Sequence, residues 1–435
     1  MDLKDRLDEA ARRHGVPGAA IAVWTDGELR EAATGVVNRA TGVETTPDSV
    51  FQVGSTTKVW TAALVMQLVE DGLVGLDRPV GDHLPGFAYG EVTVRQLLTH
   101  TGGFDGDVFE DTGRGDGCLD RYVEHLRTVA RVHEPGALFS YCNAGFCVLG
   151  ALVARLRGTT WEQAMRDRLL GPLGATQAAL FGEEAVLFRA SAGHVGPGND
   201  VYRQWQMPRS NAPAGSTMCL APRELVAFGR ALAAGGAAPG GARLLSAESV
   251  AAMLTPQVDV PGPPPGERWG LGVTLHDWGA FGHDGGTPGQ STYWHMLPEH
   301  DFGIAISANG GAFDGLLADV VRPVIEEATG VAVPPPPVPP GDPRSVDGSP
   351  YAGRYEGPQM AYEVTPAGGG LDIALLPGEL MAGMGVAPRT ARYVPLAGDT
   401  FIATESQDGR HETVTFVMRD GRAAYLHNGR AVPRV

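Results

Sequence analysis

Apolar and polar positions in the first part of the chain predict a β-hairpin followed by a buried helix. Residues 19–37 (AAIAVWTDGELREAATGVV) hold two apolar stretches on either side of the dipeptide Asp26-Gly27, a combination typical of a tight turn between antiparallel strands. Residues 57–73 (TKVWTAALVMQLVEDGL) are apolar on nearly every side of a helix. A helix without a polar face is buried, so we expect this segment at the centre of the fold.

The rest of the first 330 residues predicts a mixed architecture. Residues 91–180 are mostly helical in pattern, with glycines between the segments. Two late apolar segments, 293–297 and 302–309, predict strands, and residues 313–330 predict a closing helix. Strands at both ends of a helical middle predict an α+β core that carries an all-helical insertion.

A proline-rich segment marks the clearest boundary in the chain. Residues 331–350 contain four consecutive prolines, which cannot continue a helix or a sheet ladder and which favour an extended linker. A ligand for a proline-recognising domain is the alternative interpretation. Residues 351–435 are short alternating segments broken by Gly, Pro and Asp, which predicts a small antiparallel β-domain. We therefore expect an α+β domain over 1–330, a linker over 331–350 and a β-domain over 351–435.

Composition and charge exclude several classes of protein. The 435 residues include 34 Lys and Arg against 50 Asp and Glu, a formal net charge of −16, whereas nucleic-acid-binding proteins normally present a basic surface. No run of 18 apolar residues occurs, so no membrane span is expected. The N-terminus shows no secretory signal, and the four cysteines lack metal-binding spacing. We expect a cytoplasmic protein with reduced, buried thiols that binds neither nucleic acid nor membrane.

The scarcity of lysine draws attention to one position. The chain contains only Lys4 and Lys58, against 32 arginines. Lys58 follows Ser55 by three residues where the predicted buried helix begins, which places its amine one turn from the hydroxyl on the same face. Burial lowers the pKa of an ammonium group, so neutral Lys58 could take the proton of Ser55 and activate it as a nucleophile. In the alternative interpretation Ser55 only caps the helix and Lys58 reaches solvent.

Two further segments carry side chains that fit a nucleophilic serine. In Tyr141-Cys142-Asn143, a phenol can relay a proton and an amide can bind a carbonyl group, with a capped helix start as the alternative. Residues 283–286 read His-Asp-Gly-Gly. The glycines would let the backbone approach a ligand and His283 could donate a hydrogen bond to the site, whereas a simple glycine-rich hairpin is the alternative.

The motifs S-x-x-K at Ser55, Y-x-N at Tyr141 and H-x-G at His283 together resemble the serine β-lactamase and penicillin-binding protein superfamily. More narrowly, the chain resembles the class C β-lactamase-related family of esterases, D-aminopeptidases and transacylases. The supporting segments are GVPGAAIAV near the N-terminus, VTVRQLLTHTGG at 92–103, LLGPLGAT at 169–176, AGSTMCLAPRELVAFGRAL at 214–232 and WGLGV at 269–273.

This resemblance covers roughly residues 5–328 and implies a particular fold. The expected architecture is the α+β, β-lactamase/transpeptidase-like fold, in which an antiparallel sheet is flanked by helices and joined to an all-helical subdomain. Residues 351–435 resemble, more weakly, the lipocalin-like β-domain that such enzymes often carry.

The resemblance also implies catalytic roles for three residues. Ser55 would be the acylated nucleophile and Lys58 its activating base. Tyr141 would relay the proton during attack and during departure of the leaving group. His100 lies in the LLTHT block, which is expected to be structural, and we leave it out of the catalytic set.

Four residues are expected to bind substrate. Asn143 would orient the substrate amide or ester. His283 stands where a true class C β-lactamase carries a lysine, which lowers the expectation of β-lactam hydrolysis. The oxyanion hole would be formed by the backbone N–H groups of Ser55 and of Gly286, which follows Gly285 in the H-x-G-G segment.

These roles imply an acyl-transfer enzyme that forms a covalent acyl-Ser55 intermediate from a small ester or amide. Hydrolysis of a small metabolite is the expected reaction. The alternative is a transacylase of specialised metabolism that passes the acyl group to an amine or alcohol, and a true β-lactamase or a non-catalytic ligand-binding protein ranks below both. No G-x-S-x-G, H-E-x-x-H, paired C-x-x-C or phosphate-binding loop occurs, so we expect no metal and no cofactor. The sequence leaves the acyl donor, the acceptor and the oligomeric state open.

Overall fold

An antiparallel sheet of ten strands forms the centre of the computed structural model, which describes residues 2–262, 266–379, 382, 386–407 and 409–435. The strand order is β3-β2-β1-β15-β14-β12-β11-β10-β9, and β13 pairs with β14. The strands are β1 (Gly18–Thr25), β2 (Glu28–Asn38), β3 (Val43–Glu44), β9 (Val258–Asp259), β10 (Arg268–Trp269), β11 (Thr274–Leu275), β12 (Phe281–Gly282), β13 (Gly285–Thr287), β14 (Gln290–Leu297) and β15 (Phe302–Ala308).

The predicted N-terminal hairpin is confirmed. The register pairs Thr25 with Glu28, which leaves Asp26 and Gly27 as the two turn residues. Both have positive φ, 53° and 76°, the backbone conformation that a two-residue hairpin turn of this kind requires. The predicted late strands appear as β14 and β15, and β15 pairs with β1, so the two ends of the 1–330 region meet in one sheet.

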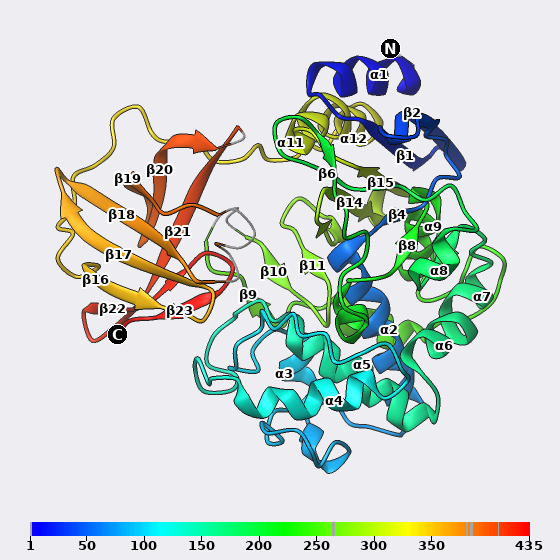
Figure 1. Ribbon diagram of the computed structural model, residues 1–435, viewed down its shortest axis with the longest axis horizontal. Coiled ribbons are helices and arrows are strands. Elements are labelled where there is room, and N and C mark those ends of the chain that lie inside the picture. The colour runs from blue at the N-terminus through cyan, green and yellow to red at the C-terminus, as the bar shows by residue number, and fades with distance from the viewer. Residues whose placement is uncertain (1, 263–265, 380–381, 383–385, 408) are drawn as a thin grey trace.

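Helices cover both faces of this sheet (Figure 1). On one face, α1, α11 and α12 pack on alternate residues of β1 and β15 such as Ile21, Ile304 and Ile306. On the other face, α9 packs on the intervening residues, among them Ala22 and Ala305. This alternation follows from the two-residue period of a strand, which directs successive side chains to opposite faces.

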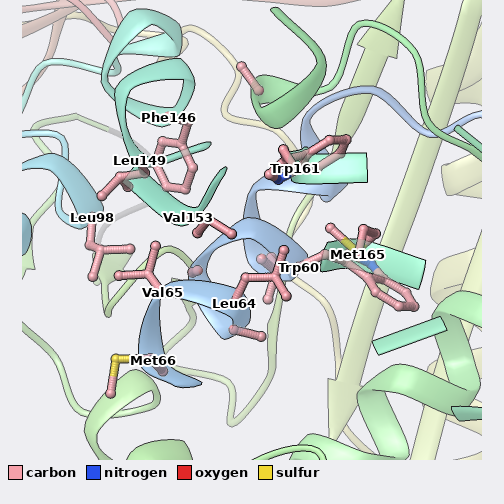
Figure 2. Packing of buried hydrophobic residues seen from close by; sticks show 14 of the residues in the cluster. Trp60, Leu64, Val65, Met66, Leu98, Phe146, Leu149, Val153, Trp161 and Met165 are labelled. Carbon is pink, nitrogen blue, oxygen red and sulfur yellow. The ribbon is translucent and has the colours of Figure 1, made fainter. Parts of the chain in front are cut away.

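Helix α2 runs through the interior of the body, as its uniformly apolar sequence predicts. Its residues from Thr57 to Leu68 are all buried. Figure 2 shows Trp60, Leu64 and Val65 of this helix among side chains of α5 and α6. The Trp60 ring also stacks on Phe228 of α9, with ring centroids 3.9 Å apart. This packing fixes the position of the first turn of α2.

The helices lie mostly between β4 and β9, which is the predicted all-helical insertion. Within the described part of the chain, none of the helices is long and apolar enough to cross a membrane. The helices are α1 (Leu3–Arg13), α2 (Thr57–Glu70), α3 (Val94–Leu98), α4 (Cys118–His125), α5 (Asn143–Arg157), α6 (Trp161–Met165), α7 (Gly171–Leu173), α8 (Gly182–Ala185), α9 (Pro222–Ala233), α10 (Ala247–Met253), α11 (Phe313–Leu316) and α12 (Arg322–Thr329).

Two small sheets complete the body. A three-stranded sheet has the order β4-β8-β5, and β6 pairs with β7. The strands are β4 (Phe51–Gln52), β5 (Ala178–Ala179), β6 (His194–Val195), β7 (Asp200–Val201) and β8 (Cys219–Leu220). Residues 331–350 form no helix or strand; that they separate two folding units stays a prediction.

The C-terminal region is an eight-stranded antiparallel sheet in sequential order with its own apolar core. A bridge between Tyr355 and Arg434 joins its first strand to the end of the chain. Two of these strands were not predicted. In β19, two arginines and Pro395 interrupt the alternation of apolar and polar residues, and β23 is only three residues long. The strands are β16 (Gly353–Glu356), β17 (Met360–Ala367), β18 (Gly370–Pro377), β19 (Arg389–Ala397), β20 (Thr400–Gln407), β21 (Arg410–Arg419), β22 (Arg422–His427) and β23 (Ala431–Pro433).

Candidate active site

Ser55 lies in a single 3-10 turn, η1 (Gly54–Thr56), that leads directly into α2. Gly54 has a φ of 54°, and a Cβ there would lie 2.4 Å from the backbone nitrogen of Gly286. A Cβ on Gly285 would lie 1.9 Å from the Val53 carbonyl oxygen and 3.2 Å from the Ser55 nitrogen. Glycine is therefore required for this close approach, which brings β13 against the Ser55 turn.

Lys58 reaches Ser55 inside the protein. The Lys58 Nζ lies 2.9 Å from Ser55 Oγ and also donates a hydrogen bond of 2.7 Å to the carbonyl oxygen of Ala214. The lysine is fully buried, and no side-chain capping hydrogen bond occurs at the start of α2. The alternative interpretation, in which Ser55 caps the helix and Lys58 reaches solvent, is therefore wrong.

Burial changes the acid–base behaviour of Lys58. Loss of hydration is the main cause that lowers the pKa of its ammonium group to about 7, and the positive charge of Arg430 contributes in the same direction. An ordinary lysine is almost fully protonated near neutral pH, whereas Lys58 has a substantial neutral fraction there. A neutral amine 2.9 Å from a hydroxyl oxygen can accept its proton.

Tyr141 and His283 form the second contact of the site. The Tyr141 hydroxyl lies 3.4 Å from His283 Nε2, and Lys58 Nζ lies 4.9 Å from the centre of the Tyr141 ring. Burial raises the pKa of Tyr141, opposed by a hydrogen bond with Ser55, so the phenol is protonated at neutral pH. Tyr141 therefore stands between the nucleophile and His283 as a neutral proton donor.

His283 was expected to donate a hydrogen bond to the site, but the structure shows it as an acceptor there. Its Nδ1 lies 2.5 Å from the carbonyl oxygen of Asp284, an atom that can only accept. The proton of the neutral ring is therefore on Nδ1, and Nε2 accepts from the Tyr141 hydroxyl. Burial, with the nearby charge of Lys58, lowers the pKa of His283 to about 3, which keeps the ring neutral. His283 thus orients Tyr141.

Asn143 lies at the first position of α5, but its amide nitrogen is already engaged. Its Nδ2 donates a hydrogen bond of 2.9 Å to Asp107 Oδ1. The same oxygen accepts a 3.0 Å hydrogen bond from Arg430 Nη2, and Arg430 Nε pairs with the other carboxylate oxygen. The structure therefore places Asn143 in a chain of polar groups that leads to Arg430, and its role toward a substrate stays a prediction.

Arg430 belongs to the C-terminal sheet, in the turn between β22 and β23, residues 428–430. This turn lies on the segment that carries Tyr141 and leads into α5. The Tyr141 N–H donates to the Gly429 carbonyl oxygen (3.0 Å), and the Ala431 N–H donates to Ser140 Oγ (3.1 Å). The guanidinium carbon of Arg430 lies 5.2 Å from the centre of the Tyr141 ring. The contribution of Arg430 to the site was not predicted. The Asn428-Gly429 dipeptide predicts a turn, but it does not indicate which surface that turn contacts.

His100 packs against the Tyr141 ring and holds the backbone next to it. Its Nδ1 accepts a 2.9 Å hydrogen bond from the Cys142 N–H, and its ring lies 4.3 Å from the Tyr141 ring, centre to centre. The residue is 1% exposed and has a φ of 57°, so its place is fixed by a strained backbone as well as by packing. This position fits the structural role expected for the LLTHT block.

A cavity of about 610 Å³ opens on these residues. Ser55, Tyr141 and His283 line it, together with side chains from the sheet, from α12, from the proline-rich segment and from the C-terminal sheet. The prolines Pro334 to Pro337 are part of the wall. Among the described residues, no group of three or more His, Cys, Asp or Glu side chains is arranged to hold a metal ion.

Comparison with known proteins decides the family. A family model described as Beta-lactamase matches residues 3–322. The chain belongs to the β-lactamase family. The resemblance of its motifs to the serine β-lactamase and penicillin-binding protein superfamily is therefore confirmed, and with it the predicted fold class.

Three relatives of the β-lactamase-family chain are informative. Penicillin-binding protein 4 of Amycolatopsis lactamdurans is 42% identical over 81% of this chain and 96% of its own length. The crystal structure of SurE with D-Leu is 30% identical, covers 100% of this chain and 98% of that chain, and has a TM-score of 0.79. The D-amino acid amidase of Ochrobactrum anthropi, solved with L-phenylalanine amide, is 25% identical over 71% of this chain and 90% of that chain, with a TM-score of 0.61. This β-lactamase-family chain therefore belongs among serine hydrolases.

Proposed function

We propose that the protein is a serine acyl-transfer enzyme that forms a covalent acyl-Ser55 intermediate from an ester or amide donor and releases the acyl group to water. The observation that carries this proposal is the contact between Ser55 Oγ and the buried Lys58 Nζ at 2.9 Å. A serine hydroxyl is a weak nucleophile until a base removes its proton. Burial lowers the pKa of Lys58 to about 7, so its neutral amine can serve as this base near neutral pH.

In the first half-reaction, Ser55 Oγ attacks the carbonyl carbon of the donor and its proton passes to Lys58. The backbone N–H groups of Ser55 and Gly286 stabilise the oxyanion, because β13 is packed against the Ser55 turn. The bond to the leaving alcohol or amine then breaks, and the protonated Tyr141 phenol relays a proton to the departing atom. His283 and His100 hold the phenol in place. In the second half-reaction, water follows the same proton path in reverse.

We further propose that the donor carries a D-amino acid at the acyl position. Two related structures support this choice, because one contains D-Leu and the other is a D-amino acid amidase. Arg430, at the cavity wall and beside Tyr141, would bind a carbonyl or carboxylate oxygen of such a donor.

Matched esters test the proposal. Wild-type protein with the p-nitrophenyl esters of N-acetyl-D-alanine and N-acetyl-L-alanine should release p-nitrophenol faster from the D-isomer. The Ser55→Ala variant should release it no faster than buffer. Equal rates for wild type and Ser55→Ala would overturn the acyl-Ser55 mechanism, whereas equal rates for the two isomers would overturn only the stereochemical part.

Transacylation to an amine or alcohol is the second candidate function. The size of the cavity favours it, because about 610 Å³ exceeds what one amino acid residue fills. Apolar walls at Trp269, Trp278 and the four prolines would also hold an acceptor while limiting access of water. The two functions share every step up to acyl-Ser55 and differ in what attacks it.

A further inference from the structure

A second group of polar side chains lines the same cavity beyond the residues assigned above. We call it the Asp284 cluster; its members are Glu267, His276, Asp284, Tyr293 and His295. His276 Nε2 lies 2.9 Å from His295 Nε2, and His295 Nδ1 lies 3.8 Å from Asp284 Oδ1. The Tyr293 and His295 rings are 4.2 Å apart, centre to centre. Ser55, Tyr141 and His283 line the same cavity as this cluster.

Two members of the cluster are buried polar groups without a partner. Tyr293 and His295 are 7% and 3% exposed. The Tyr293 hydroxyl and the His295 Nδ1 have no hydrogen-bond partner among the residues that the structure describes. An unsatisfied buried polar group costs free energy, so its retention on a cavity wall points to a ligand that completes the hydrogen bond.

Charged side chains surround the cluster. The cavity is lined by two acids, Asp284 and Glu267, and by two arginines, Arg322 and Arg410. Arg410 is neutralised by an ion pair with Asp314, whereas Arg322 makes no ion pair within the described residues. Burial lowers the pKa of His276 to about 4 and that of His295 far below its usual value, so both rings are neutral. Asp284 and Glu267 lie close enough to raise each other's cost of ionisation, so a monovalent cation bound beside them would stabilise the charged form of both carboxylates.

We propose that the Asp284 cluster is the acceptor subsite, and that it binds the primary ammonium group of an amine that attacks acyl-Ser55. The proposal rests on the acyl-Ser55 mechanism and names the acceptor class for its transacylation branch. Asp284 and Glu267 supply the charge, and the Tyr293 hydroxyl and a histidine nitrogen supply hydrogen bonds. The side chain of Asp284 is 61% exposed to the cavity, so a small amine can reach it.

The transfer conserves protons and bonds. The bound ammonium group gives one proton to Asp284 and becomes a neutral amine. Asp284 is the acid of the cluster whose side chain is exposed, so it is the group that the ammonium can reach to give up this proton. The amine nitrogen then forms a bond to the acyl carbon, and the bond from that carbon to Ser55 Oγ breaks. The second proton of the nitrogen returns to Ser55 Oγ through Tyr141 and Lys58, which leaves an amide and free Ser55.

Partition of the acyl-enzyme between two acceptors tests the proposal. The donor is the p-nitrophenyl ester of N-acetyl-D-alanine, and the acceptors are butylamine, which is an ammonium ion at pH 7.5, and the nearly isosteric neutral butanol. The measured quantity is the ratio of butylamide to free acid, or of butyl ester to free acid, by mass spectrometry. This ratio is set after the acyl-enzyme has formed, so it does not depend on how fast each variant is acylated.

We expect wild type to give butylamide in preference to butyl ester. Asp284→Asn and Glu267→Gln should each lower the butylamide-to-acid ratio about tenfold, which corresponds to loss of one ion-pair interaction, and leave the ester-to-acid ratio unchanged. Asp277→Asn is the matched control, because Asp277 is a nearby exposed acid that pairs with Arg268. It should behave as wild type.

The outcomes separate the two proposals. If wild type forms no acyl-Ser55 adduct by intact mass, the proposed function fails. If the adduct forms but both acidic variants keep the wild-type butylamide ratio, or lose amide and ester products equally, the acceptor subsite is overturned. Glu267→Gln decides the result where Asp284→Asn fails to fold, and formation of the acyl adduct shows that each variant is folded.

Discussion

The first turn of α2 and the 428–430 turn of the C-terminal sheet reach the same site by different physical means. Ser55 lies in the 3-10 turn that leads into α2 and Lys58 lies three residues on in the first turn of α2, so local helical geometry sets their contact. The 428–430 turn comes from the far end of the chain and contacts Tyr141 through backbone hydrogen bonds and the Arg430–Asp107 ion pair. Under the proposed mechanism, Ser55 and Lys58 carry out the chemistry and the 428–430 turn positions Tyr141.

Under the proposed mechanism, burial makes Lys58 a base near neutral pH, and the charge of Arg430 in the C-terminal sheet adjusts its pKa. Loss of hydration is the largest cause of the lowered Lys58 pKa, and the charge of Arg430 is a smaller cause acting in the same direction. Changes in α2 should therefore abolish activity, and changes in the 428–430 turn should weaken it.

Removal of either member of the α2 pair should have the largest effect. Ser55→Ala deletes the nucleophile and Lys58→Ala deletes its base, so we expect at least about a 10³-fold loss of turnover for each. The double variant should lose no more than the worse single variant, because the two residues act as one unit. Steady-state hydrolysis of an activated ester measures this. Near wild-type rates in either variant would contradict the assignment.

Tyr141→Phe should have the next largest effect. The substitution keeps the ring that packs on His100 and removes the hydroxyl that relays the proton. We expect about a 10²-fold loss of kcat, more severe for amides than for activated esters, because a poor leaving group needs the proton most. Comparison of an anilide with a p-nitrophenyl ester of the same acyl group measures it. Equal losses on both substrates would show that the hydroxyl does not protonate the leaving group.

Arg430→Ala should break the contribution of the C-terminal sheet. It removes the ion pair to Asp107, and with it the support of Asn143. Loss of a hydrogen bond to a charged group corresponds to about 1.5–3 kcal/mol, or about a 10- to 100-fold fall in kcat/KM. Arg422→Ala, an exposed arginine on the neighbouring strand, is the matched control and should keep wild-type activity. Identical kinetics for Arg430→Ala and Arg422→Ala would mean that the C-terminal sheet does not shape the site.

The pH dependence of the acylation rate should show the smallest difference, a shift between wild type and Arg430→Gln. Lys58 is active as a base only when neutral, so the acylation rate should rise with pH through the Lys58 pKa of about 7 and level off above it. Arg430→Gln removes a positive charge that opposes protonation of Lys58, so the Lys58 pKa should rise and the acid limb should move to higher pH. Presteady-state acylation at a series of pH values measures both. A limb that moves to lower pH or stays in place would contradict the coupling.

The parts of the fold that depend on local pattern could be predicted from the sequence. The β1–β2 hairpin follows from Asp26-Gly27 between apolar stretches, and the buried α2 follows from its lack of a polar face. β19 could not be predicted in the same way, because its arginines and Pro395 disguise the alternation. Its position is set by pairing with β18 and β20 on either side.

The site shows the same division. Ser55 and Lys58 are neighbours on one helix, so their spacing predicts their contact. Nothing in the sequence near Arg430 indicates Asp107 or Tyr141 as partners, because these contacts arise only when the C-terminal sheet packs on the loop of Asp107 and on the segment before α5. The tautomer of His283 depends on the backbone conformation that turns the carbonyl oxygen of the next residue, Asp284, toward its ring, and the sequence does not indicate that conformation.

Intact mass measured over time with an activated D-amino acid ester tests the central claim most directly. The account predicts that wild-type protein gains the mass of one acyl group, that the adduct maps to Ser55 by peptide analysis, and that Ser55→Ala shows no gain. An adduct on another residue, an equal gain in Ser55→Ala, or turnover of the ester by wild type without any adduct under rapid acid quench would contradict it.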